Sequence, residues 1–152
     1  MTISTRGRYA LRVIIDLAEN SKGTYIPMKA VAERQGLPLK YLERILAILV
    51  QNHMIEGQHG KGGGYRLTRK PEDYTVGEIL RLAEGDLAPV ACLAAGAAPC
   101  QKADVCRTLA MWKKLHTLID EYFDGITIRD LMRNESSKAD GIDISFLDAS
   151  LS

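Results

Sequence analysis

The sequence contains no run of about 18 apolar residues, so it has no segment long enough to be expected to span a membrane. Its first residues, MTISTRGRYAL, lack the apolar core of a secretory signal peptide. It also lacks a phosphate-binding loop of the form G-x(4)-G-K followed by Ser or Thr, and it shows no Cys–His pair or nucleophile elbow. We therefore expect a cytoplasmic protein that has no membrane partner and is not an enzyme.

Cysteine is scarce, and its placement is informative. The chain has three cysteines in the pattern C-x(7)-C-x(5)-C, at Cys92, Cys100 and Cys106. A secreted disulfide scaffold usually has more cysteines, in even number and spread along the chain. An odd, clustered set in a cytoplasmic protein points instead to metal binding or redox chemistry, so this window is the first candidate site.

Net charge is small, +1 over 152 residues, but it is unevenly distributed. Residues 1–84 have 13 Lys and Arg against 9 Asp and Glu, and residues 85–152 have 7 against 10. The first part therefore carries +4 and the second −3. The asymmetry is modest, but it makes the first part the candidate for binding a polyanion such as DNA.

Two short helices joined by a tight connection are predicted in the basic part. Residues 28–36, MKAVAERQG, suit a helix that closes at Gly36, where a turn needs positive φ. Residues 39–52, LKYLERILAILVQN, suit a second helix with Leu42 facing inward. Ala32 is small enough to lie at the helix crossing. This spacing is typical of a helix-turn-helix, with an ordinary helical hairpin as the alternative.

The next segment favours the helix-turn-helix interpretation. Residues 54–59 and 65–68 are short β-prone runs on either side of the glycine-rich stretch 60–64. Glycines let the backbone turn tightly and approach DNA without side-chain clashes, and Lys61 adds a positive charge. Such a hairpin directly after a helix-turn-helix is a wing. The predicted fold class is mainly α with a small β-wing: a winged helix-turn-helix domain plus a long dimerisation helix.

Two further helices are predicted to complete the DNA-binding domain. Residues 4–20 are apolar on two sides, which indicates packing on the domain and on a partner subunit, or else a helix central to a single core. Residues 76–85 follow a capping-box pattern formed by Thr75 and Glu78. The DNA-binding domain is expected to end near Gly85.

A long amphipathic helix is predicted from about Cys106 to about Phe123. A lone helix with so wide an apolar stripe must bury it, either on a twofold-related copy or on its own domain. A short capped helix is expected at 127–133. The stripe consists of Leu109, Trp112, Leu115, Ile119 and Tyr122, widened by Met111, Leu118 and Phe123.

Three regions are therefore predicted. Residues 1–85 form the winged helix-turn-helix domain, and residues 86–133 form the cysteine loop and the dimerisation helix. Residues 134–152 are rich in Ser, Asp and Lys and are expected to form a flexible tail. The apolar residues of the tail that could dock part of it are Ile142, Ile144, Phe146 and Leu147.

Six segments in this order carry a family resemblance: STRGRYAL at 4–11, the ERQGL…YLE block at 33–43, GKGGGYRL at 60–67, TVGEI at 75–79, the three cysteines, and ITIRDL at 126–131. The chain resembles the iron–sulfur cluster regulator (IscR-like) family of bacterial transcription regulators, whose relatives sense nitric oxide, iron status or cysteine supply. The resemblance covers nearly the whole chain up to about residue 133. It implies a dimeric winged-helix transcription factor with a cluster site in a loop next to the long dimerisation helix.

In a winged helix, the second helix of the helix-turn-helix enters the major groove. Lys40 and Tyr41 lie at its N-terminal end, Glu43 could accept from a cytosine amino group unless it only faces solvent, and Arg44 could donate to a guanine or a phosphate. The resemblance implies further contacts at the hairpin tip, although His59 stands where the family often has Arg. The predicted DNA-binding residues are Arg6, Arg8, Lys40, Tyr41, Glu43, Arg44, His59, Gly60 and Lys61, of which the first two are expected to meet phosphates.

The resemblance also implies that the three cysteines hold an iron–sulfur cluster, 2Fe–2S or 4Fe–4S. Family members complete the site with a His three residues after the last Cys, or with an acidic side chain of the partner's first helix. Here these positions are Leu109 and Arg8, and His116 is about 15 Å along the helix from Cys106. A weak fourth ligand and a labile cluster are therefore expected. A zinc site, a thiol–disulfide switch and a degenerate site are the alternatives.

The predicted function is a dimeric transcription repressor that binds double-stranded DNA at an imperfect palindrome. It would sense iron–sulfur, iron, redox or nitric oxide status through the cysteines. The alternative is a repressor switched by zinc or by a metal-free thiol/disulfide change. An architectural DNA-binding protein without a sensor would leave the cysteines unexplained.

Overall fold

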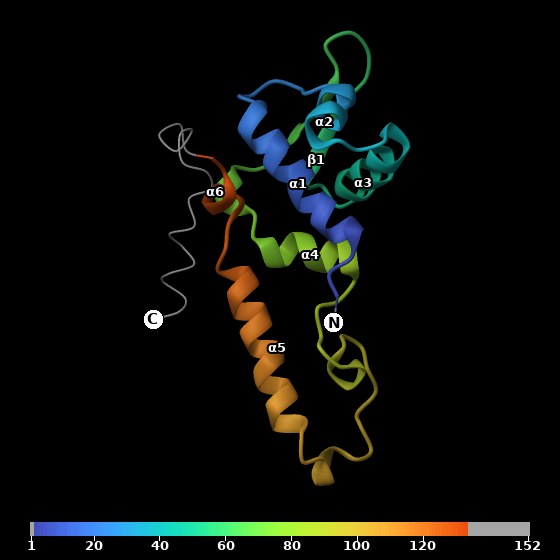
Figure 1. Cartoon of the computed structure of the whole chain (residues 1–152), viewed down its shortest axis with the longest axis vertical. Coiled ribbons are helices and arrows are strands. Elements are labelled where there is room, and N and C mark those ends of the chain that lie inside the picture. Colours follow the sequence, from blue (N-terminus) through green and yellow to red (C-terminus); the bar gives the residue numbers. More distant parts are fainter. Residues whose placement is uncertain (1, 134–152) are drawn as a thin grey trace.

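The structure is a computed structural model that describes residues 2–133 (Figure 1). The predicted tail, with its expected docking residues, lies outside the described residues. Residues 2–133 are mostly helical and contain one two-stranded antiparallel sheet, which confirms the predicted fold class. The helices are α1 (Thr5–Asn20), α2 (Met28–Gln35), α3 (Leu39–Gln51), α4 (Val76–Glu84), α5 (Leu109–Asp124) and α6 (Ile128–Leu131), and the strands are β1 (Ile55–Gln58) and β2 (Gly64–Leu67).

The boundaries of the first three helices follow local signals in the sequence. The Ser4 hydroxyl accepts a hydrogen bond from the backbone N–H of Gly7 at 3.1 Å, which starts α1. Gly36 ends α2 in the left-handed conformation, with φ of 64°, and Pro38 precedes α3. The observed α1, α2 and α3 therefore agree with the predicted helices to within one residue at each end.

Helix α1 is central to a single core, one of the two arrangements that its sequence predicts. Val13, Ile14 and Leu17 are fully buried and pack in one cluster with Leu42 of α3 and Ile79 of α4. The helix-turn-helix is thereby fixed to α1 and α4 by apolar burial, the main favourable term in folding. The second apolar stripe of α1 is half-buried against the same cluster and consists of Leu11, Ile15 and Ala18.

An ion pair between a buried carboxylate and an exposed arginine, which the sequence did not predict, joins α1 to α2. The Asp16 carboxylate is 3% exposed and accepts two hydrogen bonds from the Arg34 guanidinium, at 2.7 and 2.9 Å. The Gln35 side-chain amide donates a third, at 2.8 Å. The pKa of Arg34 is raised by its hydrogen bond to Asp16 and by the charge of that carboxylate. Because a buried carboxylate needs such partners, this pair sets the position of α2 on α1.

The hairpin β1–β2 pairs antiparallel over all four residues of each strand. Its tip turns at Gly60 and Gly62, whose φ values of 92° and 77° favour glycine. The other edge of β2 is bridged by Ile26, which exchanges two backbone hydrogen bonds with Tyr65, each of 2.8 Å. The predicted wing is therefore present and is held to the segment between α1 and α2.

The predicted capping box at the start of α4 is only half formed. The Thr75 hydroxyl accepts from the backbone N–H of Glu78 at 3.1 Å, but the Glu78 carboxylate accepts from Arg69 at 2.8 Å instead of returning to Thr75. A complete box forms at the start of α6, between Thr127 and Asp130. The predicted position of the α4 start is thus correct, and the predicted role of the Glu78 side chain is wrong.

Helix α5 extends away from the helix-turn-helix as a long arm (Figure 1). Arg81 of α4 holds it by donating to Asp120 at 3.0 Å and to Asp124 at 2.8 and 2.9 Å. The helix begins at Leu109, three residues later than the earliest predicted start, because Cys106 has an extended backbone. After α5 the chain returns, and Ile128 of α6 is buried in the same core cluster as α1. None of the helices within residues 2–133 has the length and apolarity needed to cross a membrane.

Candidate functional site

A groove of about 750 Å³ lies between α3 and the hairpin. It is lined by outward-facing residues of α3, by strand and turn residues of the hairpin, and by the first residues of α2. The groove places Glu43 of α3 opposite His59 and Gly60 of the hairpin tip. The residues that line it are Pro27, Met28, Lys29, Glu43, Ala47, Val50, Gln51, Gly57, Gln58, His59, Gly60, Gly63, Gly64 and Tyr65.

The predicted DNA-binding residues of α3 are not equivalent in the structure. Lys40, Glu43 and Arg44 are exposed, as contact with DNA requires. Tyr41 is half-buried, and its ring packs edge-to-face on Tyr9 of α1, with ring centroids 5.6 Å apart. The tyrosine therefore supports the placement of α3 on α1 whatever else it contacts.

The hairpin tip is fully accessible. His59, Gly60 and Lys61 are all exposed, and the tip projects at the top of Figure 1, far from the cysteine-containing segment at the bottom. Sequence reasoning missed Lys29, an exposed cation of the first turn of α2 that lines the groove. A basic residue at the N-terminus of the first helix of a helix-turn-helix was the signal that could have found it.

Arg6 and Arg8 lie outside this groove. Arg6 is exposed, but its Nε donates to the backbone carbonyl of Ala83 at the end of α4, at 3.0 Å. Arg8 is exposed and donates to the Thr5 hydroxyl at 3.3 Å. In Figure 1 the first turn of α1 lies beside α4, at the opposite end from the hairpin tip. Any phosphates that these two arginines meet would differ from those met by the wing.

The cysteine loop connects α4 to α5, and all three of its cysteines are exposed. Asp86 organises the start of the loop by accepting from the backbone N–H groups of Ala88 at 2.8 Å and Ala95 at 2.6 Å. These hydrogen bonds lower the pKa of Asp86, and the one donated by Ala95 has the larger effect. Hydrogen bonds from Thr108, first from its hydroxyl, lower the pKa of the Cys106 thiol.

The donor chemistry of the loop suits an iron–sulfur cluster, since three thiols lie within 15 residues of one accessible segment. The three do not yet form a ligand set. Across residues 2–133, no three His, Cys, Asp or Glu side chains are close enough together to hold a metal ion. Coordination by all three cysteines therefore requires the loop to close, which its exposed and irregular backbone permits.

Helix α5 carries a second exposed feature, an apolar face. Met111, Leu115, Leu118 and Tyr122 are between 38% and 54% exposed and follow one another at intervals of four, three and four residues. Residues at this spacing lie along one side of a helix. The other part of the predicted stripe packs on the chain itself, because Ile119 and Phe123 contact a small cluster around Val76, Leu80, Leu87 and Ile126.

Comparison with known proteins finds relatives that are similar to this chain over most of its length. The chain is 32% identical to the HTH-type transcriptional regulator IscR of Escherichia coli over 135 residues, which is 89% of this chain and 82% of that protein. Among solved structures, T. potens IscR aligns with a TM-score of 0.72 at 32% identity, over 93% of this chain and 94% of that one. CymR, the global cysteine regulator of B. subtilis, aligns with a TM-score of 0.71 at 29% identity, over 86% and 95%.

The E. coli relative is a transcriptional regulator, which agrees with the prediction that the chain is not an enzyme. Residues 3–134 match the Rrf2 family, described as iron-dependent transcriptional regulators. The match runs from the start of α1 to just beyond α6 and includes the hairpin and the cysteine loop. The chain therefore belongs to the Rrf2 family of transcriptional regulators.

Proposed function

We propose that this protein is a cytoplasmic, dimeric transcription repressor that binds an imperfect DNA palindrome and senses its signal through the cysteine loop. The observation that carries the proposal is the groove between α3 and the hairpin, which joins Glu43 of the reading helix to the tip residues His59 and Gly60. In this arrangement α3 enters the major groove and the tip approaches the adjacent backbone or minor groove. Residues 1–85 would act as the DNA-binding domain and 86–133 as the sensing and dimerisation region.

The roles of the DNA-binding residues follow from their chemistry. Glu43 would accept from a cytosine amino group, and Lys40 and Arg44 would donate to base edges or phosphates. Lys61 and Lys29 would neutralise phosphates on either side of the groove, and such contacts position a protein without reading sequence.

The exposed face of α5 supports the dimer. Its four apolar side chains repeat at near-heptad spacing, and nothing within residues 2–133 covers them. The same face on a twofold-related copy would bury both, as in an isologous interface. Two reading helices related by a twofold axis would meet two half-sites of opposite orientation, which gives the palindrome.

Cys92, Cys100 and Cys106 would hold the iron–sulfur cluster once the loop closes around it. When bound, the cluster would supply a group that is lost when iron is short and that reacts with oxidants or nitric oxide. Either change would alter the loop. Leu109 and Arg8 do not ligate iron, so the fourth position would be filled weakly. The loop is joined to α5 at Thr108, so a change in the conformation of the loop would directly move the start of the proposed dimer helix.

The thiol switch is a second candidate because Cys92, Cys100 and Cys106 are all exposed free thiols, with Cys106 beside the Thr108 hydroxyl. A thiolate attacks oxidants faster than a thiol does. Two of the three thiols would lose two protons and two electrons to an oxidant such as a peroxide and form a disulfide, without metal. Zinc held by the three thiolates is the remaining alternative.

Lys61→Ala tests the wing contact. We expect it to weaken binding to specific and random DNA by a similar factor, and to reduce the slope of log K against log salt by about 1, because one phosphate contact is lost. Lys113→Ala is the control: it removes the same charge from an exposed position of α5, the arm that extends away from the helix-turn-helix (Figure 1). An unchanged salt slope in Lys61→Ala would contradict the phosphate contact.

Glu43→Ala tests direct reading of bases. Here the sequence preference should change, with a loss of about 1–3 kcal/mol confined to DNA that has cytosine at one position of the half-site. Affinity for a panel of single-base variants of the site measures this. Equal losses on the specific site and on random DNA would remove Glu43 from the reading surface.

A further inference from the structure

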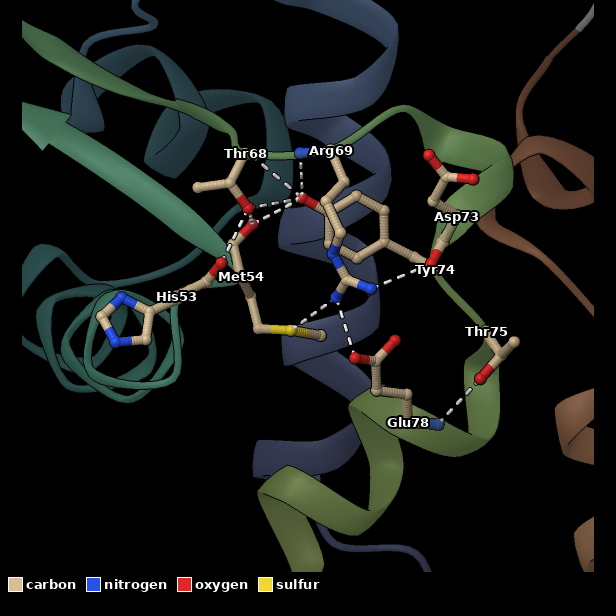
Figure 2. Close-up of polar contacts among 8 residues, drawn as sticks. All are labelled: His53, Met54, Thr68, Arg69, Asp73, Tyr74, Thr75 and Glu78. Carbon is tan, nitrogen blue, oxygen red and sulfur yellow. Dashed lines mark hydrogen bonds and ion pairs between the residues drawn. The ribbon is translucent and has the colours of Figure 1, made fainter.

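Tyr74 lies in the short 3-10 turn region between the hairpin and α4, where the sequence predicts only a turn. Its side chain is fully buried. Its hydroxyl donates to the backbone carbonyl of Met54 at 2.6 Å and accepts from the backbone N–H groups of Thr68 and Arg69, both at 3.1 Å (Figure 2). One side-chain oxygen thus forms hydrogen bonds with three backbone groups. All three groups lie just outside the regular strands.

These three groups belong to the two ends of the hairpin. Met54 directly precedes β1, and Thr68 and Arg69 directly follow β2. The Thr68 N–H is also 3.4 Å from the Met54 carbonyl, a longer contact that continues the ladder. Strands of four residues form a hairpin that is marginally stable alone, so its base must be fixed by the rest of the protein. The Tyr74 hydroxyl provides that fixed point.

Arg69 covers the tyrosine and ties it to α4. Its guanidinium lies 4.3 Å from the centre of the Tyr74 ring and donates to the Glu78 carboxylate at 2.8 Å and to the Asp73 carbonyl at 3.0 Å. Figure 2 shows Arg69 between the tyrosine ring and Glu78. This explains why Glu78 leaves the capping box: its carboxylate orients the arginine that closes over the ring.

The backbone of Tyr74 makes a second connection, to the segment after α5. The Tyr74 carbonyl accepts from the N–H of Ile128 at 3.0 Å, and the N–H of Val76 donates to Ile126 at 2.9 Å. Thr75 and Thr127 form a bridge between these two hydrogen bonds. A single residue therefore contacts the base of the hairpin through its side chain and the start of α6, just after the α5 arm, through its backbone.

We propose that Tyr74 is a positioning residue for DNA binding: its hydroxyl fixes the base of the hairpin, and hence the tip, relative to α3 and to the segment after α5. This inference rests on the proposed role of the wing in DNA binding. A small rotation of the two ends of the hairpin would displace His59, Gly60 and Lys61 at its tip. Tyr74 itself, being buried, does not touch DNA.

Tyr74→Phe tests this inference, since it keeps the ring beneath Arg69 and removes only the hydroxyl. We expect a folded protein that binds DNA about tenfold more weakly, because one buried and two part-buried hydrogen bonds to the ends of the hairpin are lost. Backbone amides of β1 and β2 should exchange with solvent faster, while those of α3 do not. Tyr25→Phe is the matched control: that ring packs under Arg66, and its hydroxyl has no hydrogen bond within residues 2–133.

A double-mutant cycle separates positioning from a general loss of stability. If Tyr74 acts through the wing tip, Tyr74→Phe should cost much less in a Lys61→Ala background than in the wild type, since the contact that it positions is already absent. A cost that is the same in both backgrounds, or wild-type affinity in Tyr74→Phe, would overturn the inference. The proposed DNA-binding role would stand in either case, because it is tested by the wild-type protein and by Lys61→Ala alone.

Glu78→Gln provides the test if Tyr74→Phe does not fold. The change weakens the contact between Arg69 and α4 by replacing the half-exposed Glu78 carboxylate with a neutral amide. It also removes a negative charge from the protein. Electrostatics alone would then strengthen binding to DNA. A positioning role predicts the opposite, a loss of about threefold, as expected for one weakened hydrogen bond to a charged group. Tighter binding by Glu78→Gln would overturn the inference.

Discussion

Leu118→Asp is expected to convert the protein to a monomer and to lower its affinity for a palindromic site more than about 100-fold, because one half-site alone provides only half of the contacts. Leu118 is 48% exposed and lies between Leu115 and Tyr122 on the apolar face of α5. In a twofold interface the substitution would place two carboxylates near one another in an apolar contact. Burying such charges without partners costs several kcal/mol, more than the gain from the remaining side chains.

The measurement is molar mass in solution, followed by DNA binding at the same protein concentrations. Thr117→Asp is the matched control, since it adds the same charge to an exposed position of α5 on a different side of the helix. The control should remain a dimer with unchanged affinity. A Leu118→Asp protein that keeps the wild-type mass would show that this face is not the dimer interface.

Arg34→Ala is expected to have the largest effect on stability, a loss of about 3 kcal/mol in the free energy of unfolding. The substitution leaves the Asp16 carboxylate, whose side chain is 2% exposed, with Gln35 as its one remaining side-chain partner. Asp16→Ala should cost less, because Arg34 is 38% exposed and can turn toward water. The double variant should be more stable than the sum of the two losses predicts.

Urea unfolding at one fixed protein concentration measures these differences, since the midpoint of the proposed dimer would depend on concentration. Arg66→Ala is the comparison: it breaks the ion pair with Glu56, in which both side chains are exposed, and should move the midpoint far less. If Arg34→Ala and Arg66→Ala shift the midpoint equally, the Asp16–Arg34 pair has no special role in holding α2.

Elements that depend on neighbours in the sequence could be predicted, and those that depend on distant partners could not. Gly36 and the glycines of the hairpin tip are residues that adopt positive φ without steric cost, which marks turns at these positions. The helix-turn-helix and the wing could therefore be predicted from the sequence. Thr75 likewise marked the start of α4. The Glu78 side chain was misassigned because Arg69, nine residues away, competes for it with a full positive charge.

The same distinction applies to the site. Exposure of Lys40, Glu43 and Lys61 follows from helical and hairpin periodicity, so these candidates were accessible to sequence reasoning. Lys29 enters the groove only because α2 packs across α3, and the Tyr74 hydroxyl meets Met54 only because the chain folds back after the hairpin. No local pattern encodes either contact. The apolar stripe of α5 was predicted, but its division into an inward and an exposed part depends on where α4 lies.

The most direct test of the account is DNA binding by the protein with and without its cluster. The protein would be purified without oxygen, assayed for iron and acid-labile sulfide, and titrated with a DNA site that it selects from a random library. We predict a coloured protein whose iron and sulfide are lost in the Cys92→Ser, Cys100→Ser, Cys106→Ser triple variant. The cluster-loaded and cluster-free forms should differ in affinity by about tenfold or more. A colourless, zinc-loaded protein, or equal affinity of the two forms, would contradict the proposal that the cysteine loop senses through an iron–sulfur cluster.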